Sequence, residues 1–471
     1  MEICPSFHDS GCFAYSEFPG AVDVDYTQWH HFSVNLYLFY TICSLPRDCG
    51  CFTYSEFPSA IRASFERLVP CIQLPDLRRI KDGGVVLSVG QGDVGQLGLG
   101  TKFMEKMRPA PIPECQDIVC IAAGGMHSVC LTKAGTVLTF GCNDEGALGR
   151  DTSVEGSETT PALVALDGKA VQVTAGDSHS AALLDDGRVF AWGCFRDSHG
   201  SMGLTLKGNE PTPVQMLPGH KIVKIASGVD HLIFLTDTGR VFTCGCAEQG
   251  QLGRVCPRSA DRHSRRGTSQ LLQPSLVQFI RSKNPRIQDV WAGSYCTFVK
   301  TYDKGEIHAF GLNNYHQLGD GTYPFPCKSE TFDGRKWKHI SSGQHHTLAL
   351  DETGQVFVLG RKEYGRLGLG ENCEDAKELT VVPTFTDFKC IDVAAGCAQS
   401  FAITDGGDLY AWGMGSNGQL GTGEEDDVQV PVVIKSKQWI KDKRNAARVV
   451  SGGQHTLILA TNTPIKDTKT D

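Results

Sequence analysis

The chain has 471 residues, of which 40% are hydrophobic, and it carries a formal net charge of −8. This is ample apolar material for a large core, and the acidic balance argues against non-specific nucleic-acid binding by the whole surface. The 19 cysteines show no regular disulfide spacing, which favours a reducing compartment. No basic secretory segment or apolar run of membrane-spanning length is visible, so we expect neither export nor a membrane contact.

Residues 1–82 precede the regular part of the sequence. They hold a local duplication, in which GCFAYSEFPGA at 11–21 returns as GCFTYSEFPSA at 50–60. A short segment of this kind has little to pack against, so we expect it to be largely disordered. The regular part spans residues 83–461, and residues 462–471 are expected to form a tail.

One pattern recurs through the regular part, a glycine-bounded anchor of which GCAEQGQLG at 245–253 is one copy. Successive copies begin 51, 52, 52, 66, 49 and 53 residues apart. Short apolar strands separated by polar and glycine turns lead into each complete copy. A fixed period of this length indicates a repeat architecture. The anchors begin at Gly90, Gly141, Gly193, Gly245, Gly311, Gly360 and Gly413.

The two ends of the regular part complement each other. Residues 84–98 hold only the second half of a unit, and residues 448–460 hold only the first half. A ring of β-sheets closes in this way when one sheet takes strands from both ends, which leaves no exposed sheet edge. We therefore predict an all-β fold, a seven-bladed β-propeller closed by a blade shared between both ends of the repeat region.

Positions that recur in every unit are expected to belong to the scaffold, whereas departures are candidates for function. One turn column holds His127, His179, His231, Cys296, His346, Gln399 and His455. Histidines spread around a ring predict hydrogen-bonding struts rather than one metal site, because zinc needs several ligands within about 2.0–2.3 Å. The positions just before this column vary, and Asp177, Asp230 and His345 are binding candidates there.

Two insertions interrupt the repeat. The anchor that begins at Gly193 is two residues longer than the one at Gly90, and we expect its loop to protrude with Phe195 and Arg196 exposed. A longer insertion precedes Ile287. On an acidic chain, its arginines are candidates for contact with an acidic partner, with a solvated loop as the alternative. They are Arg258, Arg262, Arg265 and Arg266.

Asp93 and Arg254 lie in or just after an anchor, and each is explained first by a structural role. Asp93 shares a polar anchor column with residues such as Asn314, for which turn capping is the first interpretation. Arg254 follows its anchor as Arg150 does, and its first interpretation is a solvated surface arginine.

No catalytic arrangement is visible in the sequence. There is no Gly-x-Ser-x-Gly elbow and no His-Glu-x-x-His pair. The spelling Gly90-x-Gly92-x-x-Gly95 matches a dinucleotide loop, but it occupies a turn of the β repeat and no helix follows. We therefore expect no covalent chemistry, no cofactor and no metal.

The anchors are similar to those of one known family. GQGDVGQLGLG at 90–100, FGCNDEGALGRD at 140–151 and AWGMGSNGQLGTG at 411–423 resemble the regulator of chromosome condensation family, which exchanges guanine nucleotide on the small GTPase Ran. The resemblance covers residues 83–461. It implies a nuclear, chromatin-associated protein that promotes GDP release and so generates Ran-GTP for nuclear transport and for spindle and nuclear-envelope assembly. A propeller scaffold that binds chromatin or another protein without exchange activity is the alternative.

The resemblance also implies two sets of contact residues on opposite faces. The Ran-binding set is Asp93, Asp177, Phe195, Arg196, Asp230, Arg254, His345 and His455. The nucleosome-binding set, directed at the histone acidic patch, is Arg258, Arg262, Arg265 and Arg266. Residues 195–202 resemble the family's β-wedge. DNA and import receptors are further implied partners, although the residues before Leu77 lack the basic tail that serves both contacts in the family.

Overall fold

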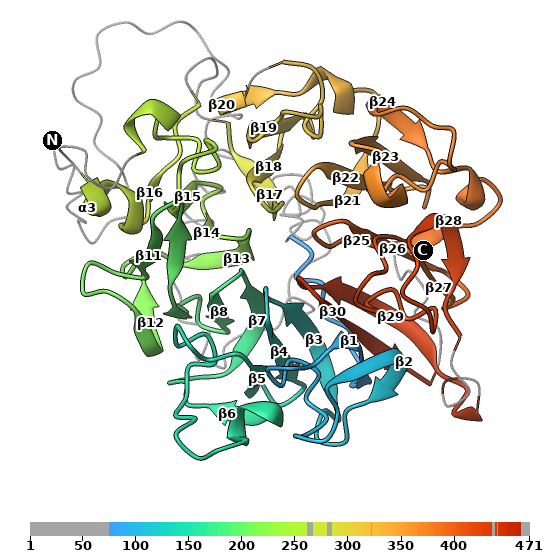
Figure 1. Ribbon diagram of the computed structural model, residues 1–471. Helices are drawn as coiled ribbons and strands as arrows, with labels where there is room; N and C mark the ends of the chain where they lie inside the picture. The colour runs from blue at the N-terminus through green and yellow to red at the C-terminus, as the bar shows by residue number, and fades with distance from the viewer. Residues whose placement is uncertain are drawn as a thin grey trace, which may run out of the picture. The chain divides into compact units, whose positions relative to one another are not determined.

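The computed structural model describes residues 75–260, 267–279, 285–321, 323–435, 439 and 441–462. Within them, seven four-stranded antiparallel sheets are arranged as the blades of a ring (Figure 1). Residues of the innermost strands line a cavity at the centre of the ring, which we call the central channel. The predicted all-β, seven-bladed propeller is therefore confirmed. The expectations for residues 1–74 and 463–471 concern segments that lie outside the described residues.

Each blade runs from an innermost strand to an outermost strand. The innermost strands of blades 1 to 7 are β3 (Ile118–Ala123), β7 (Ala170–Ala175), β13 (Ile222–Ser227), β17 (Ile287–Ala292), β21 (Trp337–Ser342), β25 (Cys390–Ala395) and β29 (Asn445–Ser451). The second strands are β4 (His127–Thr132), β8 (His179–Leu184), β14 (His231–Thr236), β18 (Cys296–Thr301), β22 (His346–Asp351), β26 (Gln399–Thr404) and β30 (His455–Thr461).

The outer half of each blade carries the third and fourth strands. The third strands are β5 (Val137–Gly141), β9 (Val189–Gly193), β15 (Val241–Gly245), β19 (Ile307–Gly311), β23 (Val356–Gly360), β27 (Leu409–Gly413) and β1 (Val85–Gln91). The fourth strands are β6 (Ala162–Val164), β12 (Glu210–Met216), β16 (Ser275–Leu276), β20 (Tyr323–Lys328), β24 (Ala376–Val381), β28 (Val428–Val433) and β2 (Glu105–Pro111).

The closing blade draws strands from both ends of the repeat region. β1 pairs with β30 in a register that runs from Val85 opposite Ala460 to Gly90 opposite His455. β2 lies outside β1 and β29 lies inside β30. The predicted shared blade is thus present, and it ties the first repeat to the last through backbone hydrogen bonds.

The core lies between the blades. Every residue of β8 and of β14 is buried, because both faces of a blade pack against its neighbours. The last anchor glycine of one blade packs on an aromatic ring of the next. A Cβ on Gly149 would lie 2.8 Å from the Trp192 ring, and one on Gly253 would lie 2.6 Å from Phe310. Because both glycines also have φ near +65°, no other residue fits there without strain.

The segment that precedes the repeats enters the central channel. Ile80 is buried and its N–H donates to the Val119 carbonyl. The Arg78 guanidinium donates to both carboxylate oxygens of Asp392 at 2.7 and 3.0 Å and lies 3.1 Å from His339 Nε2. The predicted boundary at residue 82 therefore needs correction, because residues 75–82 pack with the propeller.

The remaining elements are short. They are α3 (Gly267–Leu272) and the single-turn 3₁₀ helices η2 (Ser157–Thr159), η3 (Pro257–Ser259), η4 (Glu330–Phe332), η5 (Glu363–Gly365) and η6 (Pro383–Phe385). A two-stranded hairpin, β10 (Phe195–Asp197) with β11 (Gly200–Gly203), is inserted between the third and fourth strands of blade 2. Among the described residues, no helix has the length and apolar character needed to cross a membrane.

Candidate functional site

One rim of the propeller carries most of the irregular residues. Within each blade, antiparallel pairing places the turn between the first and second strands on the same rim as the anchor loop after the third strand. The inserted β10–β11 hairpin replaces one of these anchor loops. We call this rim the wedge face and residues 195–203 the wedge.

The recurring histidines under this rim connect neighbouring blades. Each is buried and its Nε2 lies within hydrogen-bond distance of a hydroxyl oxygen on the next blade. The pairs are His127–Ser180 (2.8 Å), His179–Ser227 (3.1 Å), His231–Thr297 (3.0 Å), His346–Ser400 (2.9 Å) and His455–Ser128 (2.9 Å). The hydroxyls of Ser128 and Ser180 in turn donate to backbone carbonyls of the preceding anchor loop. The predicted strut is confirmed as a link between blades.

The same histidines explain the Ala-Gly and Ser-Gly pairs of the repeat. A Cβ on Gly124 would lie 2.2 Å from the His127 ring, and one on Gly176 would lie 2.1 Å from the His179 ring. Burial lowers the pKa of His127 to about 4, and burial lowers the pKa values of the other four to about 3. These imidazoles are therefore neutral parts of the scaffold.

His455, which the resemblance places in the Ran-binding set, lies in the scaffold of the propeller. The side chain is fully buried and is bound to Ser128 across the junction between blades 7 and 1. It belongs to the recurring column of strut histidines, so its direct contact with a partner stays a prediction that burial does not favour.

Two carboxylates that depart from the repeat stand beside the wedge. Asp177 is exposed in the turn of blade 2, and its N–H donates to the Val229 carbonyl of blade 3 at 2.7 Å. Asp230 is half-buried and its Oδ1 accepts a hydrogen bond from the Arg196 N–H at 2.7 Å. Burial raises the pKa of Asp230 to about 7, with Asp177 and Asp197 adding repulsion, while the Arg196 N–H opposes the shift. A carboxylate held in this way favours a basic partner.

The wedge has a buried root and an exposed tip. Phe195 is fully buried, with its ring centroid 4.6 Å from that of His179, so the prediction that it is exposed is wrong. Its place in β10, next to the strut histidine of the same blade, anchors the hairpin in the core. Arg196 is exposed as predicted, and its guanidinium lies 3.2 Å from the Glu145 carboxylate of blade 1.

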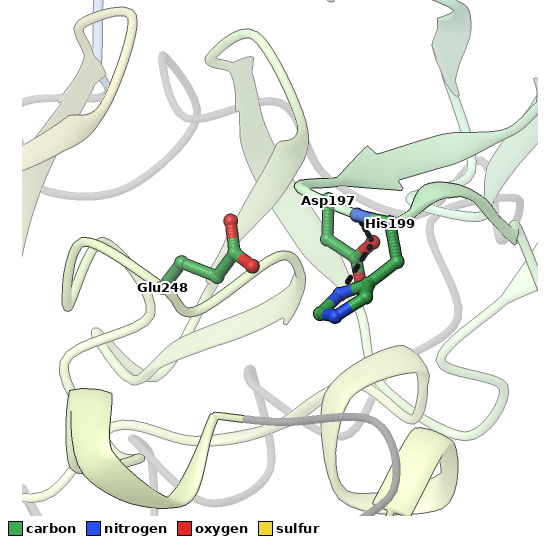
Figure 2. A group of neighbouring side chains, drawn as sticks. All are labelled: Asp197, His199 and Glu248. Atoms are coloured by element: carbon green, nitrogen blue, oxygen red, sulfur yellow. Dashed lines mark hydrogen bonds and ion pairs between the residues drawn. The ribbon is translucent and has the colours of Figure 1, made fainter.

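The tip of the wedge is held by the neighbouring blade. The Ser198 N–H and hydroxyl both donate to the Glu248 carboxylate, which projects from the anchor loop of blade 3. Figure 2 shows Glu248 facing Asp197 and His199 of the wedge. The hairpin is thus fixed at its root by burial and at its tip by hydrogen bonds, which presents it as a rigid projection.

The other predicted contact residues lie in contrasting environments. Asp93 is exposed, and its Oδ1 accepts a hydrogen bond from Gln96 Nε2 at 3.0 Å, in the turn-capping geometry that Gln317 and Asn314 repeat. The Arg254 side chain, by contrast, is bound to the backbone of this chain. Its guanidinium donates to the backbone carbonyls of Thr243, Gln270, Leu271 and Gln273.

The interpretation of Arg254 is therefore corrected. Its guanidinium fastens the α3 segment to blade 3, and Arg150 does the same in blade 1 by donating to the carbonyls of Thr139, Ser157 and Thr160. A half-buried guanidinium bound to carbonyl oxygens serves the fold and has few donors left for a partner. The interpretation as a solvated surface arginine is therefore wrong, whereas the contact with Ran stays a prediction.

His345 belongs to an aromatic and basic group that the sequence reasoning missed. Its half-buried ring lies 5.0 Å from Tyr315 in an edge-on contact, and Arg361 stacks over Tyr315 at 4.7 Å. Arg366 lies 5.3 Å from the Tyr364 ring. Burial lowers the pKa of His345, and Arg366 and Arg361 lower it further. The sequence did carry a signal for this group, because Tyr315 and Tyr364 occupy matching places in two consecutive anchor loops.

The arginine-bearing insertion is described only at its start. Arg258 is exposed in η3, whereas Arg262, Arg265 and Arg266 lie outside the described residues. Thirteen cysteines fall in the described part of the chain, and all are free thiols.

The fold and the wedge face define a class of protein, the glycine-anchored repeat propeller with a hairpin inserted into one blade.

Comparison with known proteins identifies the family within that class. The RCC1-like domain model matches residues 85–458. The regulator of chromosome condensation of Xenopus laevis is 49% identical, over 80% of this chain and 90% of the relative. The human protein of that name is 46% identical, over 84% of this chain and 97% of the relative. The chain belongs to the RCC1-like domain family.

A solved structure of the same family supports the fold. Prp20p from Saccharomyces cerevisiae, a protein characterised for its binding to Gsp1p and histones, is 29% identical and superposes with a TM-score of 0.72, over 83% of this chain and 94% of that one. Yeast RCC1 (Prp20), solved in complex with Kap60, is 28% identical with a TM-score of 0.73, over 85% of this chain and 92% of that one.

Proposed function

We propose that this protein is a guanine-nucleotide exchange factor for a Ran-type small GTPase. The observation that carries the proposal is the rigid wedge, rooted by Phe195 and flanked by the carboxylates of Asp177 and Asp230. Two further facts support it. The chain matches the human regulator of chromosome condensation over 97% of that protein's length, and its structural relative Prp20p binds Gsp1p, the yeast Ran.

Exchange of this kind needs no covalent chemistry. A protein that binds the nucleotide-free GTPase more tightly than the loaded form must weaken nucleotide binding by the same factor. A rigid projection suits this task, because a flexible loop would lose part of its binding energy on being ordered. In this proposal the wedge displaces the nucleotide-holding loops, Asp177 and Asp230 bind basic residues of the GTPase, and Asp93 and His345 contact it further out on the same face.

The proposal is tested by stopped-flow release of a fluorescent GDP analogue from Ran. We expect the full chain to accelerate release by several orders of magnitude, and to leave release from a different small GTPase unchanged. Release from Ran at its intrinsic rate in the presence of the folded protein would refute the proposal.

We propose chromatin as a second partner, and a nuclear location with it. Arg258 is exposed at the start of a basic insertion on an acidic chain, and Prp20p binds histones. An arginine that reaches a cluster of histone carboxylates forms a short, charge-assisted contact. DNA and an import receptor are further partners in this proposal, the latter because yeast RCC1 was solved with Kap60.

A nucleosome pull-down separates this second proposal from the first. The quadruple change of Arg258, Arg262, Arg265 and Arg266 to Glu should abolish nucleosome capture and leave exchange on free Ran intact. Unchanged capture would contradict the assignment of the insertion, and a parallel loss of exchange would show that the two surfaces are not separate.

A further inference from the structure

One column of the innermost strands, most of which lines the central channel, does not repeat. Each innermost strand shifts register once against its neighbour, and the residue that follows the shift stands at the same place in every blade. The side chains there include a thiol, an amide, acids and bases, so the scaffold requires no particular one, and the column is a candidate for binding. It consists of Cys120, Gln172, Lys224, Asp289, His339, Asp392 and Arg448.

The two buried carboxylates of this column differ in the source of their cation. Asp289 in blade 4 accepts a hydrogen bond from Lys224 Nζ of blade 3 at 2.5 Å, so the repeat itself supplies its partner. The Asp392 side chain in blade 6 is 5% exposed, and it forms an ion pair with Arg78, which belongs to no blade. A buried carboxylate needs a paired cation, because taking an isolated charge out of water is costly. Asp392 therefore depends on the segment that precedes the repeats.

The Arg78 guanidinium meets acceptors from three blades. Its Nη2 donates to both Asp392 oxygens of blade 6, at 2.7 and 3.0 Å, and to the Val449 carbonyl of blade 7 at 3.4 Å. Its Nη1 lies 3.1 Å from His339 Nε2 of blade 5. Desolvation lowers the pKa of His339 well below its usual range, and Arg78 lowers it further, so the imidazole is neutral and can accept this hydrogen bond. The planar fork of a guanidinium fits such a set of acceptors.

The backbone of the same segment continues to blade 1. Arg78 has a φ of +56°, a strained conformation for an arginine, and its N–H donates to Asp76 Oδ1 at 2.8 Å. Such strain persists only where the surrounding contacts hold the residue in place. Two residues later Ile80 is buried, and its N–H donates to the Val119 carbonyl of β3 at 2.9 Å. The segment thus crosses the junction between blades 7 and 1, where the ring closes.

We propose that the central channel holds a guanidinium-binding site which the chain fills with its own Arg78, and that this contact is a latch that closes the ring a second time. The first closure is the pairing of β1 with β30 inside blade 7. The latch instead connects blades 5, 6 and 7 through one side chain and reaches blade 1 through the backbone of Ile80. The stable folding unit therefore includes residues 75–82, which precede the regular part of the sequence.

Thermal unfolding of the full chain tests the site, with ethylguanidinium as the probe. Arg78→Ala leaves Asp392 unpaired, so its Tm should fall by at least about 4 °C. Millimolar ethylguanidinium replaces the atoms removed beyond Cβ and should restore at least about half of that loss, without raising the Tm of the wild type. Arg79→Ala is the matched control, because it removes an exposed neighbouring arginine and should change neither quantity. A loss that the probe does not reduce, or an equal loss in both variants, would overturn the site.

A double variant identifies the acceptor. Adding Asp392→Asn to Arg78→Ala removes the unpaired charge, so the Tm should rise above that of Arg78→Ala alone and should no longer respond to ethylguanidinium. A response of the same size in the double variant would reject Asp392 as the group that binds the guanidinium.

Amide hydrogen exchange tests the latch, and it decides the matter alone if Arg78→Ala does not fold. Asp392→Asn keeps the shape of the side chain but loses the charge that holds Arg78, so exchange should become at least about tenfold faster at Ile80 and in β1 and β30. β14 in blade 3 lies outside the latch and should keep its wild-type rates. Unchanged rates at Ile80 and in blade 7, or an equal increase in β14, would contradict the latch. These measurements use no GTPase, so their outcome is independent of the proposed exchange function.

Discussion

The strut histidines and the irregular residues beside them lie on the same rim of the propeller but differ in burial and in their partners. His346 is buried and bound to Ser400 of the next blade, whereas His345, its neighbour in sequence, is half-buried against Tyr315. The first repeats around the ring and the second does not. The difference teaches that in a repeat protein the residues that follow the period build the ring, and the residues that break it are available for binding.

The largest expected difference between the strut histidines and the surface residues is in the pH dependence of the unfolding free energy. The five strut histidines have pKa values lowered to about 3 or 4 by burial, so below about pH 6.5 the unfolded chain binds more protons than the folded one. Their contribution to stability is complete above about pH 6.5 and falls as the pH drops. Each histidine costs about 1.4 kcal/mol per pH unit in that range.

Urea unfolding between pH 7.5 and 5 measures this effect. Together the five histidines cost roughly 7 kcal/mol per pH unit, which is comparable with the whole stability of a typical domain. We expect His346→Gln to remove one histidine's share, about 1.4 kcal/mol per pH unit, from the slope of unfolding free energy against pH, because glutamine does not titrate. The variant should still fold, because Gln399 occupies the same column in blade 6 and its side chain donates to the Gly453 carbonyl. A stability that does not change between pH 7.5 and 5.5 would contradict buried, neutral struts.

A paired substitution in blade 5 sharpens the comparison. His346→Ala removes the link to Ser400 and leaves a cavity, so it should cost about 2–4 kcal/mol of unfolding free energy. His345→Ala should cost less than about 1 kcal/mol. Chemical denaturation at pH 7.5 compares the two, and equal costs would remove the distinction between strut and surface.

Asp230 should show stability and function changing in opposite directions. Its pKa is raised to about 7, so the folded state favours the protonated form, and stability falls as the pH rises from about 4 to 7. Asp230→Asn keeps the oxygen that accepts the Arg196 N–H, and we expect its Tm at pH 7.5 to be unchanged or higher. Exchange on Ran should fall by at least about tenfold. A lower Tm together with wild-type exchange would contradict this assignment.

The smallest expected effects are those of Arg196. Its guanidinium is exposed and its pair with Glu145 lies at the surface, where such pairs contribute roughly 0–1 kcal/mol. Arg196→Ala should therefore leave Tm within about two degrees and change mainly the salt dependence of association with the GTPase. A large loss of stability would show that the arginine is part of the scaffold, as Arg254 is.

The sequence predicts the ring because its signals are periodic. Seven anchors at a near-constant spacing determine the blade number, and the two half-units at the ends determine the closure. The periodic column also identifies His127 and its equivalents as struts. Asp177 and Asp230 became binding candidates because they depart from their columns, and both lie on the wedge face.

The remaining errors concern burial, which spacing alone does not report. Phe195 lies on an inserted loop, yet its ring fills the space beside His179. Arg254 follows an anchor in a surface pattern, yet the carbonyls it binds belong to α3, a segment folded back onto blade 3. Arg78 reaches Asp392, more than 300 residues away in the chain. Each depends on a contact that the repeat pattern does not contain and that only the folded chain shows.

The most direct test of the account removes the tip of the wedge and spares its root. Replacing residues 196–201 with Asn-Gly removes most of the hairpin, keeps Phe195 and Met202 in the core and connects them through a tight turn. Stopped-flow GDP release from Ran should fall by at least about a hundredfold, while the Tm of the propeller stays within about two degrees of the wild type. Release at the wild-type rate by this folded variant would contradict the claim that the irregular wedge carries the function.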